Sequence, residues 1–444
     1  MARFVRAFGA RVVSAGGSLV IVLVLAKFFG VEALGVFAVA HAFFVAGSLV
    51  ATWGAGNALM KFVGADRVSA GTLCIVVFAI KRAVWVGGVL GAVLAASAPW
   101  LADRFDMAEL SPILIGVAVS IPLMGLVRVL SGIYKGLGRA DIGCLLDNGG
   151  VLLAMSLLAL ASVWQSGEFA ITLAVSYGVA TLAFLVFGLV GLLGYWKQLL
   201  AASAEVDTFR TGAHREDYKR YKSVAQDFLY VNCSSLLMHS GAFILAGLYL
   251  SKQDVGLLKA AQQVAVAVEF VQMVLNAIYP PKFARAWAKR NTAELRSLVH
   301  SCFVLGFWGA FPFYIVITLW PGEVLSLLDR GLAQGGGVLI LVATGQMINV
   351  LTGPGAQLLG MTDYSRRMRN ISIASYVLSF LVMPPLIDAF SVEGGAIALL
   401  LFIALPNVIA LYYASKLVSI RVVPGFRDFW GITKRCVAIN QGRT

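Results

Sequence analysis

Charged residues are scarce in this chain of 444 residues: they make up 13% of it, whereas hydrophobic residues make up 59%. A soluble protein of this length could not bury so much apolar side chain, so lipid must surround most of the molecule. The longest polar stretch, residues 197–222, is too short to enclose a core. The scarcity of charge therefore excludes a sizeable soluble domain.

Paired cysteines are also missing. The five cysteines, Cys74, Cys144, Cys233, Cys302 and Cys436, are scattered along the chain. This spacing excludes a disulfide framework, and it matches no familiar metal site. We therefore predict neither a metal ion nor a cofactor.

Long apolar runs are abundant instead. Twelve runs have the roughly 20 residues that a helix needs to cross a bilayer. They are centred near residues 20, 47, 90, 122, 152, 182, 238, 267, 309, 347, 379 and 406. A barrel would show alternating strands, so these uninterrupted runs predict an all-α integral membrane protein of about twelve transmembrane helices. The first run follows three arginines as in a signal peptide, but its length and the eleven later runs predict a retained helix.

The net charge of +13 has a topological explanation. Every second loop is basic, and these loops hold 29 of the 35 Lys and Arg residues. They are residues 3–11, 61–82, 135–139, 197–222, 282–296, 366–369 and 416–443. The intervening loops hold only Arg104, Lys252 and Arg330. This positive-inside pattern predicts that both termini are cytoplasmic, and it argues against a nucleic-acid partner.

The two halves of the sequence resemble each other. LVRVLSG at 126–132 in the first half matches MINVLTG at 347–353 in the second. Three more matches keep nearly the same offset: GLGRAD (136–141) with LLGMTD (358–363), LAKFFGVEALG (25–35) with LAGLYLSKQDVG (245–256), and Lys61-Phe62 with Lys282-Phe283. Four matches in one register indicate a duplication.

A duplication of this kind predicts the organisation of the chain. Six crossings per half return the chain to its starting side, so the two repeats should be parallel. Such a construction places its working cavity between the lobes, near the midplane of the membrane. We predict an N-terminal six-helix lobe at 1–196, a cytoplasmic linker at 197–222, a C-terminal six-helix lobe at 223–420 and a cytoplasmic tail at 421–444.

The predicted helix near residue 267 carries a polar stripe. Lys259, Gln262, Glu269, Gln272 and Asn276 fall within an arc of about 140° at 100° per residue. A helix that faces lipid would not carry such a stripe, so we expect it to face a wet cavity. A structural seam between helices is the alternative. Glu269 lies near the middle of the helix, which makes it the central candidate for coupling to an ion.

Other polar residues inside the spans have two interpretations each. Lys27 and Arg128 lie near helix ends, where a long side chain can also extend to the headgroups. His41 shares a helix face with Ser48 and Thr52, and each membrane histidine can equally be a packing residue. The candidate substrate-binding residues are Lys27, His41, Arg128, Asn232, His239, Lys259, Gln262, Gln272 and Asn276. Asp227 is a second ion-coupling candidate, although pairing with a basic residue is the plainer interpretation of both Asp147 and Asp227.

The chain resembles the bacterial polysaccharide flippases of the O-antigen (Wzx) type. The resemblance rests on LAKFFGVEALGVFAVA at 25–40, on VLSGIYKGLGRAD at 129–141, and on twelve spans in two halves. These flippases belong to the multidrug/oligosaccharidyl-lipid/polysaccharide exporter superfamily. The resemblance implies a V-shaped bundle of the kind found in MATE exporters and MurJ, which alternates between inward-open and outward-open states.

The resemblance also implies the cargo. It would be an undecaprenyl-diphosphate-linked oligosaccharide of O-antigen, capsule or exopolysaccharide synthesis, moved across the bacterial inner membrane. The implied partners are this lipid-linked oligosaccharide, membrane lipids, a proton or sodium ion, and polysaccharide-assembly proteins.

Two other classes of protein compete with this interpretation. A multidrug antiporter of the same superfamily often has an acidic residue on its first helix, and residues 12–29 contain none. The charges inside the spans include Lys27, Arg128 and Lys259, which suit an anionic cargo better than a cationic drug. A membrane-embedded glycosyltransferase or polymerase would need a substantial loop or a DxD-like pair, and the sequence offers neither. We therefore predict a transporter and not an enzyme.

Overall fold

The computed structural model describes residues 2–65, 68, 70–163, 168–204, 221–222, 225–226, 236–418, 420–425 and 429–433. All regular elements in these ranges are helices. Nine of the helices found there are long and apolar enough to cross a membrane. The all-α, multi-pass membrane protein expected from the sequence is therefore confirmed. Most of the predicted linker and tail lies outside the described residues.

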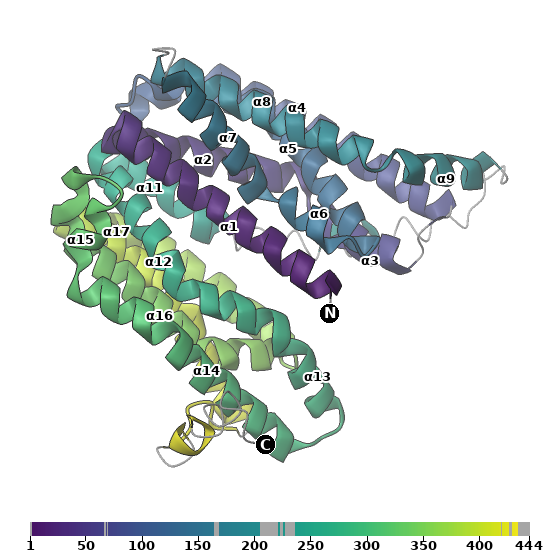
Figure 1. Cartoon of the computed structure of the whole chain (residues 1–444), viewed down its shortest axis with the longest axis vertical. Coiled ribbons are helices and arrows are strands. Elements are labelled where there is room, and N and C mark those ends of the chain that lie inside the picture. Colours follow the sequence, from purple (N-terminus) through teal and green to yellow (C-terminus); the bar gives the residue numbers. More distant parts are fainter. Residues whose placement is uncertain are drawn as a thin grey trace. The chain divides into compact units, whose positions relative to one another are not determined.

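The chain divides into two compact units, Met1–Gly256 and Leu257–Thr444. The first unit contains α1 (Ala2–Phe29), α2 (Val31–Thr52), α3 (Ala55–Ala65), α4 (Ala70–Arg104), α5 (Leu110–Gly136), α6 (Ala140–Leu145), α7 (Asn148–Val163), α8 (Phe169–Val190), α9 (Leu193–Ala204), the π-helical turn η2 (Leu237–Gly241) and α11 (Ala242–Tyr249). Within this unit α5 packs against α2, α3, α4 and α8, and α1 packs against α7 (Figure 1).

The second unit begins inside α12 (Lys252–Ile278). It continues with α13 (Pro280–Ala288), α14 (Thr292–Leu319), α15 (Pro321–Ser326), the 3-10 helix η3 (Arg330–Gly335), α16 (Gly336–Gly360) and α17 (Ser365–Leu417). In this unit α16 packs against both α14 and α17. The boundary between the units lies within α12, and lobes that end at 196 and begin at 223 stay a prediction.

The centre of each of the twelve predicted spans lies in a helical segment of the described chain. The last two share α17, whose 53 residues are interrupted at Ser391, where φ is 53° and ψ is −131°. Within the described residues, α7 extends over 16 residues and α11 over 8. In α11 the chain enters through a π-helical turn, and most of the residues before that turn are not described.

Apolar side chains cover the outside of the helices as well as the interior. On α4, for example, Trp85, Val93 and Trp100 are exposed. Large exposed apolar side chains spaced along a whole helix are what lipid as a solvent requires. Inside the first unit, close helix contact depends on glycine at particular positions. A Cβ atom on Gly132 of α5 would overlap the backbone of Gly56 on α3.

Candidate functional site

Arg128 of α5 is held by a neutral partner on α2. Its Nε atom donates a hydrogen bond to Ser48 Oγ at 3.2 Å. The Ser48 hydroxyl donates its own proton to the Val45 carbonyl at 3.0 Å, so its oxygen is presented to the guanidinium as an acceptor. Ser48 is fully buried and Arg128 is half-buried. In the described part of the chain, the hydrogen-bond partner of this cation is thus a hydroxyl and not a carboxylate.

Asp147 exerts an electrostatic effect on Arg128. Its carboxylate pairs with another cation, because Lys135 Nζ lies 2.9 Å from one carboxylate oxygen and 3.0 Å from the other. Ser131 Oγ donates a further hydrogen bond to it at 3.0 Å. The expected pairing of Asp147 with a basic residue is confirmed. Arg128 therefore interacts with the Asp147 carboxylate only electrostatically, because the hydrogen bonds to this carboxylate come from other residues.

His41 lies in an aromatic cluster of the first unit. Its ring stacks on Phe37 with the centroids 5.2 Å apart, and its Nδ1 atom lies 3.3 Å from the Tyr177 hydroxyl. The imidazole is buried. These are the contacts of a packing residue, and a contact between His41 and substrate stays a prediction.

The structure gives little information on the remaining candidates for substrate binding and ion coupling in the first half of the chain. Lys27 is exposed on the last turn of α1, which fits both of its interpretations. His239 lies on the η2 turn, and its side chain is not described. Asp227 and Asn232 lie outside the described residues. Their predicted roles in ion coupling and substrate binding stay predictions.

The polar stripe on α12 makes contacts at both of its ends. At the first end, Lys259 Nζ donates to Gln262 Oε1 at 3.1 Å. At the other end, Gln272 is buried and its Nε2 atom donates to Asn276 Oδ1 at 3.2 Å. The same Asn276 oxygen accepts a second hydrogen bond from Gln357 Nε2 of α16. Gln272 and Gln357 each leave a buried amide oxygen without a partner in the described chain.

Glu269, in the middle of the stripe, faces α16 of the same unit. The Gln346 side chain acts electrostatically on its carboxylate. The Gln346 amide oxygen in turn accepts from Asn349 Nδ2 at 3.4 Å, and Asn349 Oδ1 accepts from Asn407 Nδ2 of α17 at 3.1 Å. At this depth the stripe therefore contacts a polar face of α16. Whether its free side also lines a cavity stays a prediction.

Gln346, Gln357 and Asn407 were not predicted from the sequence. A signal existed for α16, because residues 346, 349, 353 and 357 follow helical spacing and so share one face. Asn407 stands alone in an apolar stretch of α17 and gave no such signal.

The sequence repeat adds a relation between the polar groups of the two units. At the offset that aligns 126–132 with 347–353, Ser48 corresponds to Glu269, and Arg128 corresponds to Asn349. Arg128 bonds directly to Ser48, whereas Asn349 donates to Gln346 of its own helix. The same pair of helix positions thus carries a cation and a hydroxyl in the first unit, and an amide and an acid in the second.

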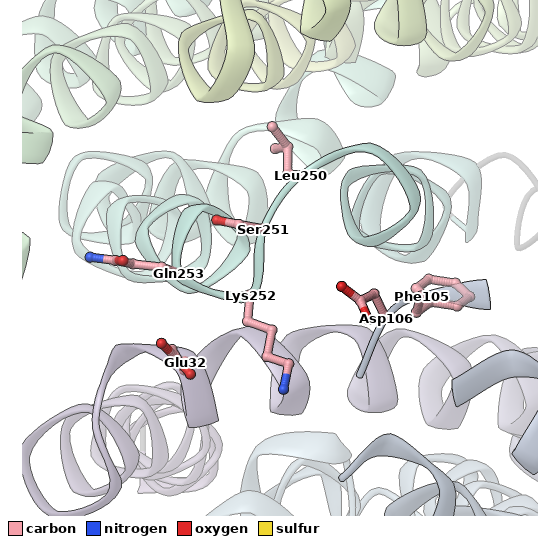
Figure 2. Close-up of a pocket in the computed structure, with 7 residues that line it drawn as sticks. All are labelled: Glu32, Phe105, Asp106, Leu250, Ser251, Lys252 and Gln253. Atoms are coloured by element: carbon pink, nitrogen blue, oxygen red, sulfur yellow. The ribbon is translucent and has the colours of Figure 1, made fainter. Parts of the chain in front are cut away.

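A small pocket lies at the end of the helices that the loop charges predict to be outside. It measures about 320 Å³ and is lined by Glu32, Phe105, Asp106, Leu250, Ser251, Lys252 and Gln253 (Figure 2). In Figure 2 the Lys252 side chain extends between Glu32 and Asp106. Its ammonium pairs with Glu109 at 2.7 Å, and this hydrogen bond is the main reason why the pKa of Glu109 is lowered. The pocket was not predicted from the sequence.

More than half of the chain matches a known protein family. The family described as polysaccharide biosynthesis protein matches residues 7–287. The chain belongs to this family. A curated relative, the probable low-salt glycan biosynthesis flippase Agl15 of Haloferax volcanii, is 23% identical over 268 residues. That match covers 58% of this chain and 54% of the relative, so the chain spans about half the length of this protein.

Solved structures share the fold over nearly the whole chain. An inward-facing multidrug resistance MATE family transporter of the MOP superfamily has a TM-score of 0.69 at 13% identity, covering 91% of this chain and 94% of its own. The lipid II flippase MurJ in an inward closed conformation has a TM-score of 0.69 at 11% identity, covering 97% and 89%. The MATE multidrug transporter DinF-BH, solved with R6G, has a TM-score of 0.67 at 14% identity, covering 95% of each chain. The predicted resemblance to the exporter superfamily is confirmed.

Proposed function

We propose that this protein is a flippase that moves a lipid-linked oligosaccharide across the bacterial cytoplasmic membrane. The cargo would be an undecaprenyl-diphosphate-linked unit of O-antigen, capsule or exopolysaccharide, carried by alternating access that is coupled to a proton or sodium ion. Both termini would lie in the cytoplasm. Family membership, the printed name of the curated relative and the transporter fold support this proposal.

The observation that carries the proposal is the environment of Arg128. A cation inside a membrane helix is expensive unless it is paired, and such a residue is a functional candidate by default. Here the guanidinium donates to a serine hydroxyl, while the nearby carboxylate of Asp147 is engaged by Lys135. Other N–H groups of Arg128 can therefore bind a diphosphate, whose oxygens match the planar guanidinium in a bidentate manner.

The second unit supplies groups for the rest of the cargo. Sugar hydroxyls both donate and accept hydrogen bonds, and the amides of Gln262, Gln272 and Asn276 offer both functions. Glu269 would take up the coupling ion, since a carboxylate at mid-helix binds either a proton or a cation. Lys259 would offer the anionic cargo a further cation. The lipid tail would stay in the bilayer while the headgroup crosses.

Reconstitution in liposomes tests the role of Arg128. The assay follows a fluorescent undecaprenyl-diphosphate-linked oligosaccharide from one leaflet to the other. Hydrogen bonds to charged groups contribute about 1.5–3 kcal/mol, so Arg128→Gln should slow flipping about 10- to 100-fold. Arg128→Lys should recover only part of the rate, because an ammonium cannot form the bidentate contact. The exposed Arg104, at the end of α4, provides the control Arg104→Gln, which should keep the wild-type rate.

Two results would count against the proposal. If Arg128→Lys and Arg128→Gln both flip the lipid at the wild-type rate, Arg128 only anchors the helix at the headgroups. If the wild-type protein flips no lipid but exchanges protons on addition of rhodamine 6G, the multidrug antiporter is correct. The second candidate is retained because a structural neighbour of the same fold was solved with R6G. Replacement of Glu269 by Gln should abolish coupled transport in either case.

A further inference from the structure

Helices α2 and α12 cross at the end that the loop charges predict to be outside. A Cβ atom on Gly35 would overlap the carbonyl of Lys252, and one on Gly256 would overlap the carbonyl of Val31. All of these residues belong to the first compact unit. We call residues 31–35 and 252–256 the outer crossing. Because glycine has no side chain, the two backbones lie against each other here without interlocking side chains.

The outer crossing joins equivalent positions of the sequence repeat. At the offset that aligns 126–132 with 347–353, Val31 corresponds to Lys252 and Gly35 corresponds to Gly256. Each glycine therefore meets the carbonyl of the same position in the other copy, which makes the contact self-complementary. The first copy supplies α2 and the second supplies α12. Any separation of the two copies at this end has to open the crossing.

An ion pair lies beside the backbone contact. Lys252 Nζ lies 2.7 Å from Glu109 Oε2, and Glu109 directly precedes α5. The pair thus joins a residue of the second copy to a residue of the first. Figure 2 shows the Lys252 side chain extending between Glu32 and Asp106. Among the residues that line this pocket, Lys252 is the only basic one.

Ordered turns present both partners of the ion pair. At the start of α12, Ser251 Oγ donates to Asp254 Oδ2 at 2.7 Å and accepts from the Asp254 backbone N–H at 3.2 Å. In the turn between α4 and α5, Phe105 is buried and lies against α11, because a Cβ atom on Gly247 would be 2.9 Å from the Phe105 ring. The ammonium and the carboxylate are therefore brought together by fixed backbone on both sides.

The ion pair has no equivalent in the other half of the repeat. The positions that correspond to Lys252 and Glu109 are Val31 and Arg330, which cannot form an ion pair. The crossing thus combines a symmetric backbone contact with an ion pair on one side only. We propose that this pair is an electrostatic latch, which holds the outer crossing closed until the cargo leaves on that side. The inference rests on the alternating access of the proposed function.

The exposure of the pair suits a bond that is broken in every cycle. The side chains of Lys252 and Glu109 are 25% and 46% exposed. A buried pair would be costly to separate, whereas water hydrates both partners of an exposed pair when they part. Exposed pairs of this kind should shift the balance between the closed and open crossing by about 1.5- to 5-fold.

Thiol labelling measures the opening of the crossing. The reporter is Val39→Cys, because Val39 is fully buried on α2 and lies against Gly247 of α11. The five native cysteines are replaced by alanine, and a membrane-impermeant maleimide is added to intact spheroplasts. Lys252→Gln and Glu109→Gln should each raise the labelling rate about 1.5- to 5-fold. The double variant should label no faster than Lys252→Gln, since both changes break the same bond.

Two controls and a salt series separate the latch from a general loss of stability. Lys252→Arg keeps the positive charge and should label at the wild-type rate. Glu168→Gln removes an exposed carboxylate before α8, away from the pair, and should also leave the rate unchanged. High salt screens an exposed ion pair, so it should raise the wild-type rate and leave that of Lys252→Gln unaltered.

A cross-link tests whether the latch has to open during transport. A reducible linker that joins the two thiols of the double variant Glu109→Cys/Lys252→Cys should stop the flipping of lipid-linked oligosaccharide in liposomes. Reduction of the linker should restore flipping. Flipping at an undiminished rate with the linker in place would show that the crossing stays closed throughout transport, and the inference would be wrong.

The remaining outcomes separate the latch from the proposed function. If Lys252→Gln and Glu109→Gln both label at the wild-type rate, the pair is an ordinary surface contact and the inference is wrong. If Val39→Cys does not fold, deuterium uptake by residues 242–256 in Lys252→Gln decides the question by the same criterion. If labelling rises as expected but the wild-type protein moves no lipid-linked oligosaccharide, the latch stands and the proposed cargo is wrong.

Discussion

The side-chain amide of Gln272 on α12 occupies the space that a Cβ atom on Gly353 of α16 would need. Glycine at this point lets the buried glutamine lie against the neighbouring helix and reach Asn276. The polar stripe of α12 is thus fitted to a gap in the surface of α16.

Gly353→Ala should therefore destabilise the protein. The added methyl group displaces the Gln272 amide and breaks its hydrogen bond to Asn276, which should lower the free energy of unfolding by about 1 kcal/mol. Thermal unfolding in mild detergent measures the change. Gly360→Ala is the matched control on the same helix, because no atom of the described residues lies within 4 Å of its Cβ position. In the background Gln272→Ala the effect of Gly353→Ala should vanish, and an unchanged effect there would contradict the explanation.

Two glycines of the first unit, Gly35 and Gly256, make a reciprocal contact. A Cβ atom on Gly35 of α2 would overlap the carbonyl of Lys252, and one on Gly256 would overlap the carbonyl of Val31. The two glycines occupy equivalent positions in the two copies of the sequence repeat. Gly35→Ala and Gly256→Ala should each destabilise the protein by about 1–3 kcal/mol, because the obstacle is backbone and cannot move aside.

Thermal unfolding of the purified chain checks this prediction. The control is Gly178→Ala on α8, where the described part of the chain places no atom within 4 Å of the new methyl group. Equal melting temperatures for all three variants would show that the helices separate without penalty.

The ion pair of Glu109 and Lys252 should make a small, pH-dependent contribution to stability. The hydrogen bond from Lys252 lowers the pKa of Glu109, so the folded protein binds this proton more weakly than the unfolded chain. The contribution is therefore present above the ordinary pKa of a glutamate and is lost as the pH falls through the lowered value. Because the pair is partly exposed, about 0.2–1 kcal/mol is expected at neutral pH.

Glu109→Gln measures this contribution. The variant should be slightly less stable than the wild type at pH 7, and the difference should disappear in acid and shrink at high salt. Glu168→Gln, at an exposed position before α8, is the control. A stability difference that persists below the lowered pKa would mean that the carboxylate charge is not its cause.

Ser391 holds the backbone in a conformation that favours glycine. Its φ of 53° and ψ of −131° are strained for a residue with a side chain. Ser391→Gly should remove this strain and raise the free energy of unfolding by about 1 kcal/mol or more. Ser372→Gly, within the helical part of α17, should have the opposite sign because glycine weakens a helix. Destabilisation by both variants would mean that the Ser391 side chain contributes more than the strain costs.

The sequence predicted most of the fold because lipid imposes a simple rule on it. Each long apolar run had to become a helix. The internal repeat alone identified Arg128 and Asn349 as equivalent positions in the two halves of the sequence. The stripe on α12 was also visible, since five polar residues at helical spacing stand out against an apolar background. Local pattern was sufficient for each of these features.

Other features depend on contacts between distant parts of the chain. Lys252 and Glu109 are far apart in the sequence, and the sequence around either residue gives no indication that the two form an ion pair. Asn407 reads as a single polar residue in an apolar helix until the structure places it beside Asn349. Ser391 was missed for another reason: most sharp reversals are marked by glycine or proline, and this one is formed by a serine.

The reversal at Ser391 joins the two helical parts of α17 directly, so the connection between them cannot extend. No loop separates them, and a Cβ atom on Gly394, just after the turn, would overlap the carbonyl of Leu386, just before it. Sliding one part past the other by a single helical turn would need about 5 Å of spare backbone, which this connection does not contain. In the transport cycle that we propose, the final hairpin would move as one rigid unit and carry Asn407 with it.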